Sequence, residues 1–242
     1  MDIRGKFALV TGSSKRLGRS IAVEFGRRGA RVAVHHRASD SEADARETLR
    51  SIRAAGGDGD VFRAELRDLQ QVDSMFAAIQ ATFGQLDVLV NSASVFSPSS
   101  PDETTEEHWD EQMNSNAKAP FFVAQRAARL MTEGKIINMA DVAGELIWPG
   151  HFAYSVSKAT LLAINRGLAR AYAPRIQVNA IAPGPVLFPE YYSNDQKRSA
   201  VERTLLKREG SPQDIVNAVM FLIENDYITG EVIHVDGGRH VM

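Results

Sequence analysis

Three side chains in the stretch from Asp141 to Lys158 could together move a proton. Tyr154 and Lys158 stand four residues apart, and Asp141 lies thirteen residues before the tyrosine. On a helix, residues at i and i+4 share one face, so the ammonium can lie beneath the phenol. A nearby positive charge lowers the pKa of a tyrosine, which makes Tyr154 a predicted proton donor or acceptor near neutral pH. The competing interpretation is an ordinary amphipathic helix, because this spacing is common.

The elements that must position these side chains alternate regularly along the chain. Short apolar runs predict strands at 7–10, 31–36, 60–65, 86–91, 135–140, 177–182 and 231–235. Amphipathic segments predict helices near 17–29, 41–55, 69–83, 105–131, 152–172 and 212–224. Buried strands flanked by helices indicate a parallel sheet covered on both faces, so we predict a doubly wound α/β fold. We expect one domain over 1–242, with a lid at 183–211 that is partly helical near 195–206.

Composition limits the classes of protein to consider. The net charge is −2, from 28 basic and 30 acidic residues, and this balance does not suggest a nucleic-acid partner. The chain has no cysteine, which excludes disulfides and thiolate zinc sites. The histidines show no spacing typical of a metal site, and we expect no metal. No apolar run is long enough for a membrane span or a targeting segment, so we expect a cytoplasmic enzyme.

The first predicted strand leads into a turn suited to a dinucleotide. In the stretch "VTGSSKRLGRS", Gly12 allows a tight turn and Gly18 allows a helix to approach the sheet closely. The start of that helix offers free N–H groups for a pyrophosphate. The usual fingerprint has three glycines, and Arg16 stands in place of the middle one.

The end of the second predicted strand indicates which nicotinamide cofactor is used. An NAD site places an acid there, whereas this chain has His36, Arg37 and Ser39. Arg37 and the Ser39 hydroxyl can bind a 2′-phosphate, which an acid would repel. We therefore predict NADPH/NADP as the cofactor. The alternative is that Arg37 is a solvated loop charge.

These motifs resemble the short-chain dehydrogenase/reductase family over essentially the whole chain. The resemblance is carried by "TGSSKRLG", "NSAS" at 91–94, Asn116, "YSVSK" and the late "DGG". Within the family the chain looks most like pteridine reductases and dihydropterin-reducing relatives, because of "KRLGRS", "NSASVF" and Asp141. The resemblance implies a Rossmann-type single domain, usually assembled as a homotetramer.

The resemblance also implies roles for residues. Tyr154 would protonate the substrate, and Lys158 would lower its pKa and bind the nicotinamide ribose. The main-chain carbonyl of Asn116 would hold a water, and the sequence adds a reason: Pro120 has no N–H, so this carbonyl loses its helical partner. The implied cofactor-binding residues are Gly12, Ser14, Arg16, Leu17, Gly18, His36, Arg37, Ser39, Glu65, Leu66, Asn91, Ser92, Ala93, Tyr154, Lys158, Pro183, Gly184 and Val186.

Departures from the family pattern affect part of this set. Ser92 stands where the family commonly has a second asparagine, and Glu65 takes the place of the acid that contacts adenine. The "PG" at 183–184 lacks the threonine that often follows, which puts contacts to the carboxamide in doubt.

Asp141 discriminates between substrates, because most family members have serine there. An ionised carboxylate 4 Å from a developing negative charge costs about 4 kcal/mol at an effective dielectric of 20. The site thus suits a simple ketone poorly unless Asp141 stays protonated, and it suits a pterin that must gain a proton. This assignment requires the carboxyl to face the Tyr154 hydroxyl; the alternative is that Asp141 caps a loop and points away.

Phe96 follows the fourth predicted strand, at the position where pteridine reductases stack the pterin against the nicotinamide. A flat ring gains from such a face, although an exposed loop phenylalanine is the alternative. The predicted substrate contacts are Arg16, Ser94, Phe96, Asp141, Trp148, Tyr154 and Leu187. Phe152, Phe188, Tyr191 and Tyr192 are further candidates to close the pocket, by lid packing or by substrate contact.

We predict an NADPH-dependent reductase of a dihydropterin- or dihydrofolate-like C=N bond, with protons delivered through Tyr154 and Asp141. One alternative is a carbonyl reductase acting on a 3-oxoacyl thioester, quinone or sugar ketone. A second is a non-catalytic NADPH-binding scaffold or sensor, which the intact Asn116, Tyr154 and Lys158 do not favour.

Overall fold

Fully buried strands build the centre of the molecule. In the computed structural model, which describes all 242 residues, seven strands pair in parallel in the order β3-β2-β1-β4-β5-β6-β7. All six residues of β5 are buried, as expected for a strand covered on both faces. The strands are β1 (Phe7–Val10), β2 (Arg31–His36), β3 (Asp58–Arg63), β4 (Val88–Asn91), β5 (Gly134–Met139), β6 (Ile176–Pro183) and β7 (Val232–Val235).

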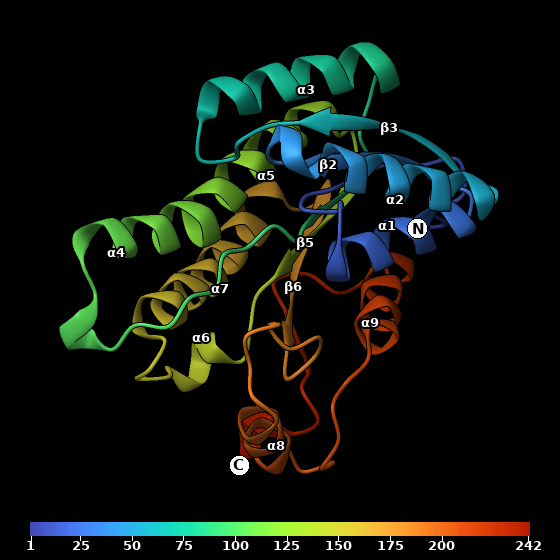
Figure 1. Cartoon of the computed structure of the whole chain (residues 1–242). Coiled ribbons are helices and arrows are strands. Elements are labelled where there is room, and N and C mark those ends of the chain that lie inside the picture. The colour runs from blue at the N-terminus through green and yellow to red at the C-terminus, as the bar shows by residue number, and fades with distance from the viewer.

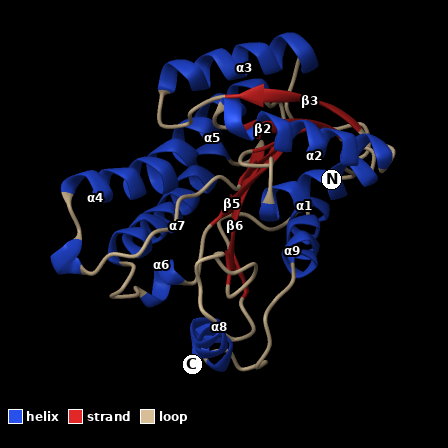
Figure 2. Cartoon of the chain, in the orientation of Figure 1, coloured by secondary structure: helices blue, strands red, loops and turns tan.

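Helices cover both faces of this sheet (Figures 1 and 2). They are α1 (Arg16–Arg27), α2 (Glu42–Ala54), α3 (Leu69–Phe83), α4 (Glu106–Met113), α5 (Ala119–Leu130), α6 (Ala143–Leu146), α7 (Phe152–Tyr172), α8 (Asn194–Glu202) and α9 (Pro212–Glu224). One apolar core joins the sheet to α3, α5 and α7, and a second joins it to α1, α2 and α9. The predicted doubly wound α/β fold is confirmed.

The alternation of side chains along each strand divides these two cores. In β1, Leu9 faces the core of α3, α5 and α7, whereas Ala8 and Val10 face the core of α1, α2 and α9. Successive residues of a strand point to opposite faces, so one apolar run supplies both. This explains why the strands appear in the sequence as continuous apolar runs.

The largest difference from the predicted elements concerns the helix expected over 105–131. The structure has α4, then a π-helical turn over Asn114–Lys118, then α5. The Ala119 N–H donates to the Asn114 carbonyl five residues earlier, and Pro120 follows in the first turn of α5. Because proline cannot donate a hydrogen bond, the regular i→i+4 pattern is interrupted here, and π turns often mark functional sites.

The segment after β6 contains one helix, as predicted. The expected helical part near 195–206 is α8, which ends at Glu202. In Figure 1 this segment lies below the carboxyl end of β6, and the C-terminus lies beside α8.

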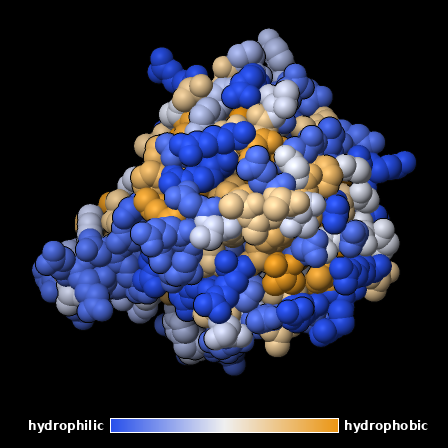
Figure 3. All heavy atoms as spheres, turned by 90° about the horizontal axis from the view of Figure 1, so that it is seen from above, coloured by the Kyte–Doolittle hydropathy of each residue, from blue (hydrophilic) through white to orange (hydrophobic).

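Seen from above, hydrophilic side chains cover much of the surface, with hydrophobic patches between them (Figure 3). A helix both long and apolar enough for a membrane span is absent from the fold.

Candidate active site

A large cavity opens at the carboxyl ends of the strands, where the strand order reverses between β1 and β4. Ligands of doubly wound folds bind at this point. Its volume of about 1230 Å³ exceeds the roughly 300–1,000 Å³ of ordinary ligand pockets, so a dinucleotide and a second molecule can share it.

The cavity brings together most residues predicted from the sequence. Those that line it are Gly12, Ser14, Arg16, Leu17, Gly18, His36, Arg37, Glu65, Leu66, Ser92, Ala93, Ser94, Phe96, Asp141, Trp148, Tyr154, Lys158, Pro183, Gly184, Val186, Leu187, Phe188, Tyr191 and Tyr192. Ser39, Asn91, Asn116 and Phe152 do not line it.

The turn between β1 and α1 leaves no room for side chains at its glycines. Gly12 has a φ of +64°, and a Cβ there would lie 2.9 Å from the Cα of Ala93. A Cβ on Gly18 would lie 2.5 Å from the Gly12 carbonyl oxygen. The turn therefore stays close to the start of α1, whose free N–H groups suit a pyrophosphate.

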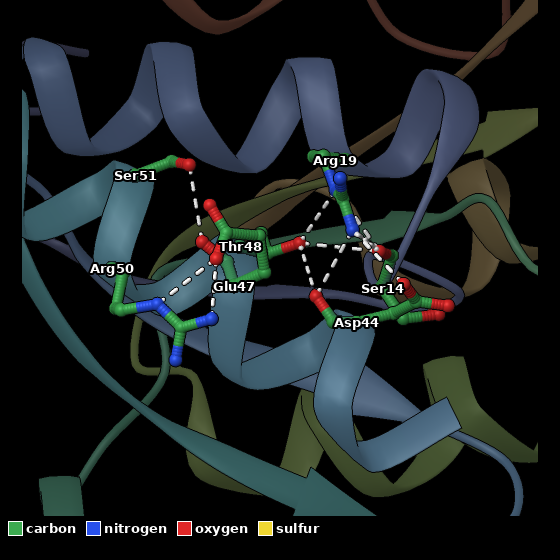
Figure 4. A network of polar contacts seen from close by, with 7 residues as sticks. All are labelled: Ser14, Arg19, Asp44, Glu47, Thr48, Arg50 and Ser51. Atoms are coloured by element: carbon green, nitrogen blue, oxygen red, sulfur yellow. Dashed lines mark hydrogen bonds and ion pairs between the residues drawn. The ribbon is translucent and has the colours of Figure 1, made fainter. Parts of the chain in front are cut away.

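A polar network fixes this turn to α1 and α2 (Figure 4). The Ser14 carbonyl accepts from Arg19 Nε at 3.0 Å and from the Thr48 hydroxyl at 3.2 Å. Arg19 also donates to the Asp44 carbonyl at 3.1 Å. Because these bonds use the back of the turn, its cavity side remains free for a ligand.

Two further residues that sequence reasoning missed hold the same region. The Nδ1 atom of buried His35 accepts from the Gly12 N–H at 2.9 Å, and its Nε2 lies 3.0 Å from the Ala64 carbonyl. Burial lowers the pKa of His35 to about 4, so the ring is neutral and can accept at Nδ1. The Thr11 hydroxyl accepts from the N–H groups of Ser92 and Ala93. A polar residue at the end of a buried strand was the available signal for both.

Arg37 brings an unpaired cation to the region predicted to bind the 2′-phosphate. Arg37 is exposed and forms no ion pair, and it lines the cavity. The buried His36 is occupied by its own loop, because its Nδ1 lies 2.9 Å from the Ala38 carbonyl. Glu65 binds the Arg67 side chain at 2.9 Å, which lowers the pKa of its carboxyl despite partial burial.

Asp141 and Tyr154 form a direct pair. The Tyr154 hydroxyl donates to Asp141 Oδ2 over 2.8 Å, and Asp141 Oδ1 accepts from the Ala143 N–H at 2.8 Å. Burial of the carboxyl raises the pKa of Asp141, although the Ala143 N–H, Lys158 and Tyr154 oppose this. The carboxyl faces the phenol, as the sequence-based assignment required.

The predicted effect of Lys158 on Tyr154 is wrong for this arrangement. Burial first, and then the Asp141 carboxylate, raise the pKa of Tyr154 well above its usual value. Lys158 Nζ lies 5.7 Å from the centre of the tyrosine ring and donates to the Met139 carbonyl at 2.8 Å. Burial lowers the pKa of Lys158 to about 8. The sequence placed Tyr154 and Lys158 on one helix face and the Asp141 carboxyl beside the phenol. It did not indicate that this carboxyl raises the pKa of Tyr154, or that the Met139 carbonyl binds Lys158.

Asn116 lies in the π turn, completely buried. Its side-chain oxygen accepts from the Ser94 hydroxyl and the Val95 N–H, both at 2.9 Å, and its amide donates to the Ser157 hydroxyl at 3.1 Å. The side chain thus joins the loop after β4 to α7, which carries Tyr154. Asn91 is likewise turned inward and donates to Asn138 at 3.0 Å.

An aromatic wall stands beside the Tyr154 hydroxyl. Phe96 stacks on His151, with ring centres 4.5 Å apart, and meets the Tyr154 ring edge-on at 4.7 Å. Tyr192, from the segment after β6, lies 6.5 Å from Phe96. The Arg16 side chain donates to the Leu187 carbonyl, so it also holds that segment. A flat ring can therefore lie against Phe96 and close to the proton donor.

Comparisons with known proteins agree with this architecture. A family model described as enoyl-(acyl carrier protein) reductase matches residues 12–240. The 3-oxoacyl-[acyl-carrier-protein] reductase FabG of Staphylococcus aureus is 36% identical over 244 residues, covering 98% of each chain.

Two solved structures extend the comparison. The angucycline C-6 ketoreductase LanV with bound NADP has a TM-score of 0.93 at 34% identity, covering 100% of this chain and 98% of its own. FolM alternative dihydrofolate reductase 1 from Brucella canis, complexed with NADP, has a TM-score of 0.92 at 30% identity, covering 100% and 96%. The cofactor in both agrees with the one predicted from the sequence. The chain belongs to the short-chain dehydrogenase/reductase family and is an NAD(P)-dependent oxidoreductase.

Proposed function

We propose that this protein is an NADPH-dependent ketoreductase that acts on a carbonyl group within a flat ring system. This departs from the C=N reduction that the sequence favoured and takes up its carbonyl-reductase alternative. Both FabG and LanV are named as reductases of carbonyl compounds, which supports the change.

The cavity suits NADPH at one end. The glycine turn has no room for side chains and presents the start of α1, and the unpaired Arg37 offers a cation for a 2′-phosphate. Lys158 lines the same cavity and is held by the Met139 carbonyl, which supports assigning it to the ribose next to the nicotinamide. The bound cofactor supplies the hydride.

The observation that carries the proposal is that the Tyr154 hydroxyl donates to the Asp141 carboxyl while the Tyr154 ring meets Phe96 edge-on. Tyr154 can give its proton to a carbonyl oxygen as negative charge develops there. Because burial raises the pKa of Asp141, its carboxyl can be neutral and donate a hydrogen bond, as the more common serine hydroxyl does. A neutral carboxyl removes the electrostatic objection to a ketone.

The aromatic wall favours a flat substrate over an open acyl chain. Phe96 meets the Tyr154 ring edge-on, and His151 and Tyr192, which line the same cavity, lie next to Phe96. Aromatic pairs prefer offset-stacked or edge-to-face contacts that a flat ring can make and a flexible chain cannot.

Reduction of a dihydropterin C=N bond is the second candidate. It is supported by the 2.8 Å contact of Asp141 and Tyr154, which could pass a proton to a ring nitrogen, and by the similarity to FolM.

Oxidation of NADPH in the presence of four substrates tests these alternatives. They are a bicyclic aromatic ketone, an acetoacetyl thioester, dihydrobiopterin and dihydrofolate. We expect the ring ketone to have the highest kcat/KM. Turnover of only the pterins would establish the second candidate, and turnover of only the thioester would contradict the requirement for a flat ring. Inertness toward all four would overturn the proposal.

A further inference from the structure

A half-buried arginine near the C-terminus faces the cavity without a partner for its charge. The guanidinium carbon of Arg239 lies 4.5 Å from the centre of the Trp148 ring. Arg239 lines the cavity together with Asp141, Tyr154 and Tyr192. Its side chain forms no ion pair and no hydrogen bond within the chain, although its burial lowers the pKa of the guanidinium. Burying an unpaired cation of this kind costs free energy unless a ligand pairs with its charge.

The C-terminal turn is built to hold Arg239 in this place. Asp236 Oδ1 accepts from the Gly238 N–H at 2.9 Å, and Oδ2 accepts from the His240 N–H at 2.7 Å. Gly237 and Gly238 both have positive φ, and a Cβ on Gly238 would lie 2.8 Å from Leu205. The turn therefore packs closely on the segment after α8. Since Asp236 is occupied by these bonds and by the His240 ring, it leaves Arg239 unpaired.

This packing brings a second arginine to the same part of the cavity. Arg203 follows the end of α8, lines the cavity and also forms no ion pair or side-chain hydrogen bond. The Asp141 carboxylate favours the charge of Arg239 from a distance without forming an ion pair with it, and Arg203 is close enough to disfavour that charge. Two neighbouring cations without a carboxylate in contact become favourable when an anion binds between them.

We propose that Arg239, supported by the Trp148 ring and assisted by Arg203, recognises an anionic oxygen group on the flat substrate, such as a carboxylate or an acidic phenol. The N–H donors of a guanidinium lie in one plane and can bind such a group through its edge, while the face of the guanidinium stays stacked on the Trp148 ring. Asp141 and Tyr154 lie in the same cavity, so the anionic group would point away from them, and the carbonyl toward them. The inference deepens the proposed function and rests on it for the identity of the ring.

Binding to the NADP complex of the full chain tests the subsite without requiring turnover. The probes are 2-naphthoate and the neutral 2-naphthamide, measured by titration calorimetry. We expect naphthoate to bind about tenfold or more tightly than naphthamide, the range of a charge-assisted hydrogen bond. Arg239→Gln should remove this preference, Arg239→Lys should restore part of it, and Arg203→Gln should reduce it. The control is Arg50→Gln on the outer face of α2 (Figure 4), where Arg50 pairs with Glu47.

The two proposals fail in different ways. A wild-type protein that binds both probes equally would overturn the subsite, as would an Arg239→Gln variant that weakens both probes to the same degree. If the variant also loses NADP affinity, Arg203→Gln decides: an unchanged preference for naphthoate in that variant then counts against the subsite. Discrimination between the probes without reduction of any ring ketone would refute the proposed function and leave the subsite in place.

Discussion

The hydroxyl of Tyr154 and the carboxyl of Asp141 form one hydrogen-bonded unit, 2.8 Å between oxygens, at the floor of the cavity. Burial raises the pKa of both groups; the Asp141 carboxylate further raises the pKa of Tyr154, whereas the hydrogen bond from Tyr154 favours the charged form of Asp141. The Tyr154 hydroxyl therefore keeps its proton, and the pKa of the buried Asp141 carboxyl lies above its ordinary value. This makes Asp141 a candidate donor to a carbonyl oxygen, and it makes the protonation of the pair the property to test first.

Ketone reduction should decline as pH rises through the raised pKa of Asp141, because the ionised carboxylate opposes the developing oxyanion. At 4 Å and an effective dielectric of 20 this repulsion is about 4 kcal/mol, or close to a thousandfold in rate. Asp141→Ser replaces the carboxyl with a hydroxyl that does not ionise in this range. We expect kcat/KM of the variant to stay level where that of the wild type falls. Both proteins retain Lys158, but the Asp141 charge raises the lysine's pKa of about 8 against the effect of burial, so the lysine step moves to lower pH in the variant and is fitted separately in the two profiles. Parallel profiles would remove Asp141 from the proposed role.

Tyr154→Phe should remove the proton donor and keep the shape of the cavity. The phenylalanine ring can still meet Phe96 edge-on, and Lys158 still binds the Met139 carbonyl. We expect kcat for the ring ketone to fall by about 10²–10⁴-fold, the usual contribution of a positioned acid. Affinity for NADPH, measured by titration of protein fluorescence, should change little. A loss shared equally by kcat and NADPH affinity would show that the hydroxyl acts on the structure and not on the reaction.

The fold could be predicted from the sequence because strand and helix patterns are local. Continuous apolar runs were enough to predict β1, β2 and β5, because these strands are buried on both faces. The glycine at position 12 was enough to predict the turn after β1. The structure divides 105–131 into α4, a π turn and α5. From the sequence, Pro120 predicted only that the Asn116 carbonyl loses its helical partner, not that the helix is interrupted. The shift of hydrogen bonding to i→i+5 occurs where Asn116 of the turn binds Ser157 of α7, a contact between segments distant in the sequence.

The cavity brings together most of the residues predicted from the sequence, but the sequence did not indicate how their charges and hydrogen bonds act on one another. Spacing placed Tyr154 and Lys158 on one face of α7, whereas the acceptor of Lys158 is the Met139 carbonyl at the end of β5. The brace at His35 and the cation at Arg239 also depend on contacts between segments far apart in the sequence. The only local signal for His35 is its place at the end of a buried strand, and no local pattern distinguishes Arg239 from a solvated arginine.

Arg37→Ala should alter the choice of cofactor. Arg37 is an exposed cation without an ion-pair partner at the end of β2, where a 2′-phosphate would lie. Loss of charge-assisted hydrogen bonds should weaken NADPH binding by about ten- to a hundredfold and leave NADH binding unchanged. The matched control is Arg46→Ala, which removes an exposed arginine of α2 that pairs with Glu42. Equal weakening of both cofactors, or none, would contradict the assignment.

Gly18→Ala should displace the turn that receives the pyrophosphate. The new Cβ would lie 2.5 Å from the Gly12 carbonyl oxygen, so α1 or the turn must move. Overpacking of this kind costs about 1–3 kcal/mol, and we expect both a lower Tm and weaker NADPH binding. Gly167→Ala is the control, because its Cβ on α7 would meet no atom within 4 Å. That variant should gain up to about 1 kcal/mol in stability through helix propensity and bind NADPH normally. If Gly18→Ala and Gly167→Ala have the same Tm and the same NADPH affinity, the close approach of Gly18 to the Gly12 carbonyl is not needed for the turn.

His35 should make the stability of the protein depend on pH in a defined window. Burial lowers its pKa in the folded state to about 4, whereas an unfolded histidine titrates near 6.5. As pH falls from about 6.5 to 4, the unfolded chain takes up a proton that the folded chain refuses, so the free energy of unfolding decreases. The difference of about 2.5 pKa units corresponds to at most about 3 kcal/mol.

The matched variant for this prediction is His35→Gln, whose amide can accept from the Gly12 N–H and donate to the Ala64 carbonyl without titrating. Urea unfolding at pH 7 and pH 5 should show a smaller loss of stability in the variant than in the wild type. NADPH affinity at pH 7 should be retained, because the brace on the glycine turn is kept. His35→Phe fills the space without an acceptor, and it should weaken NADPH binding at every pH. If all three proteins lose the same stability between the two pH values, the imidazole is not the group that titrates.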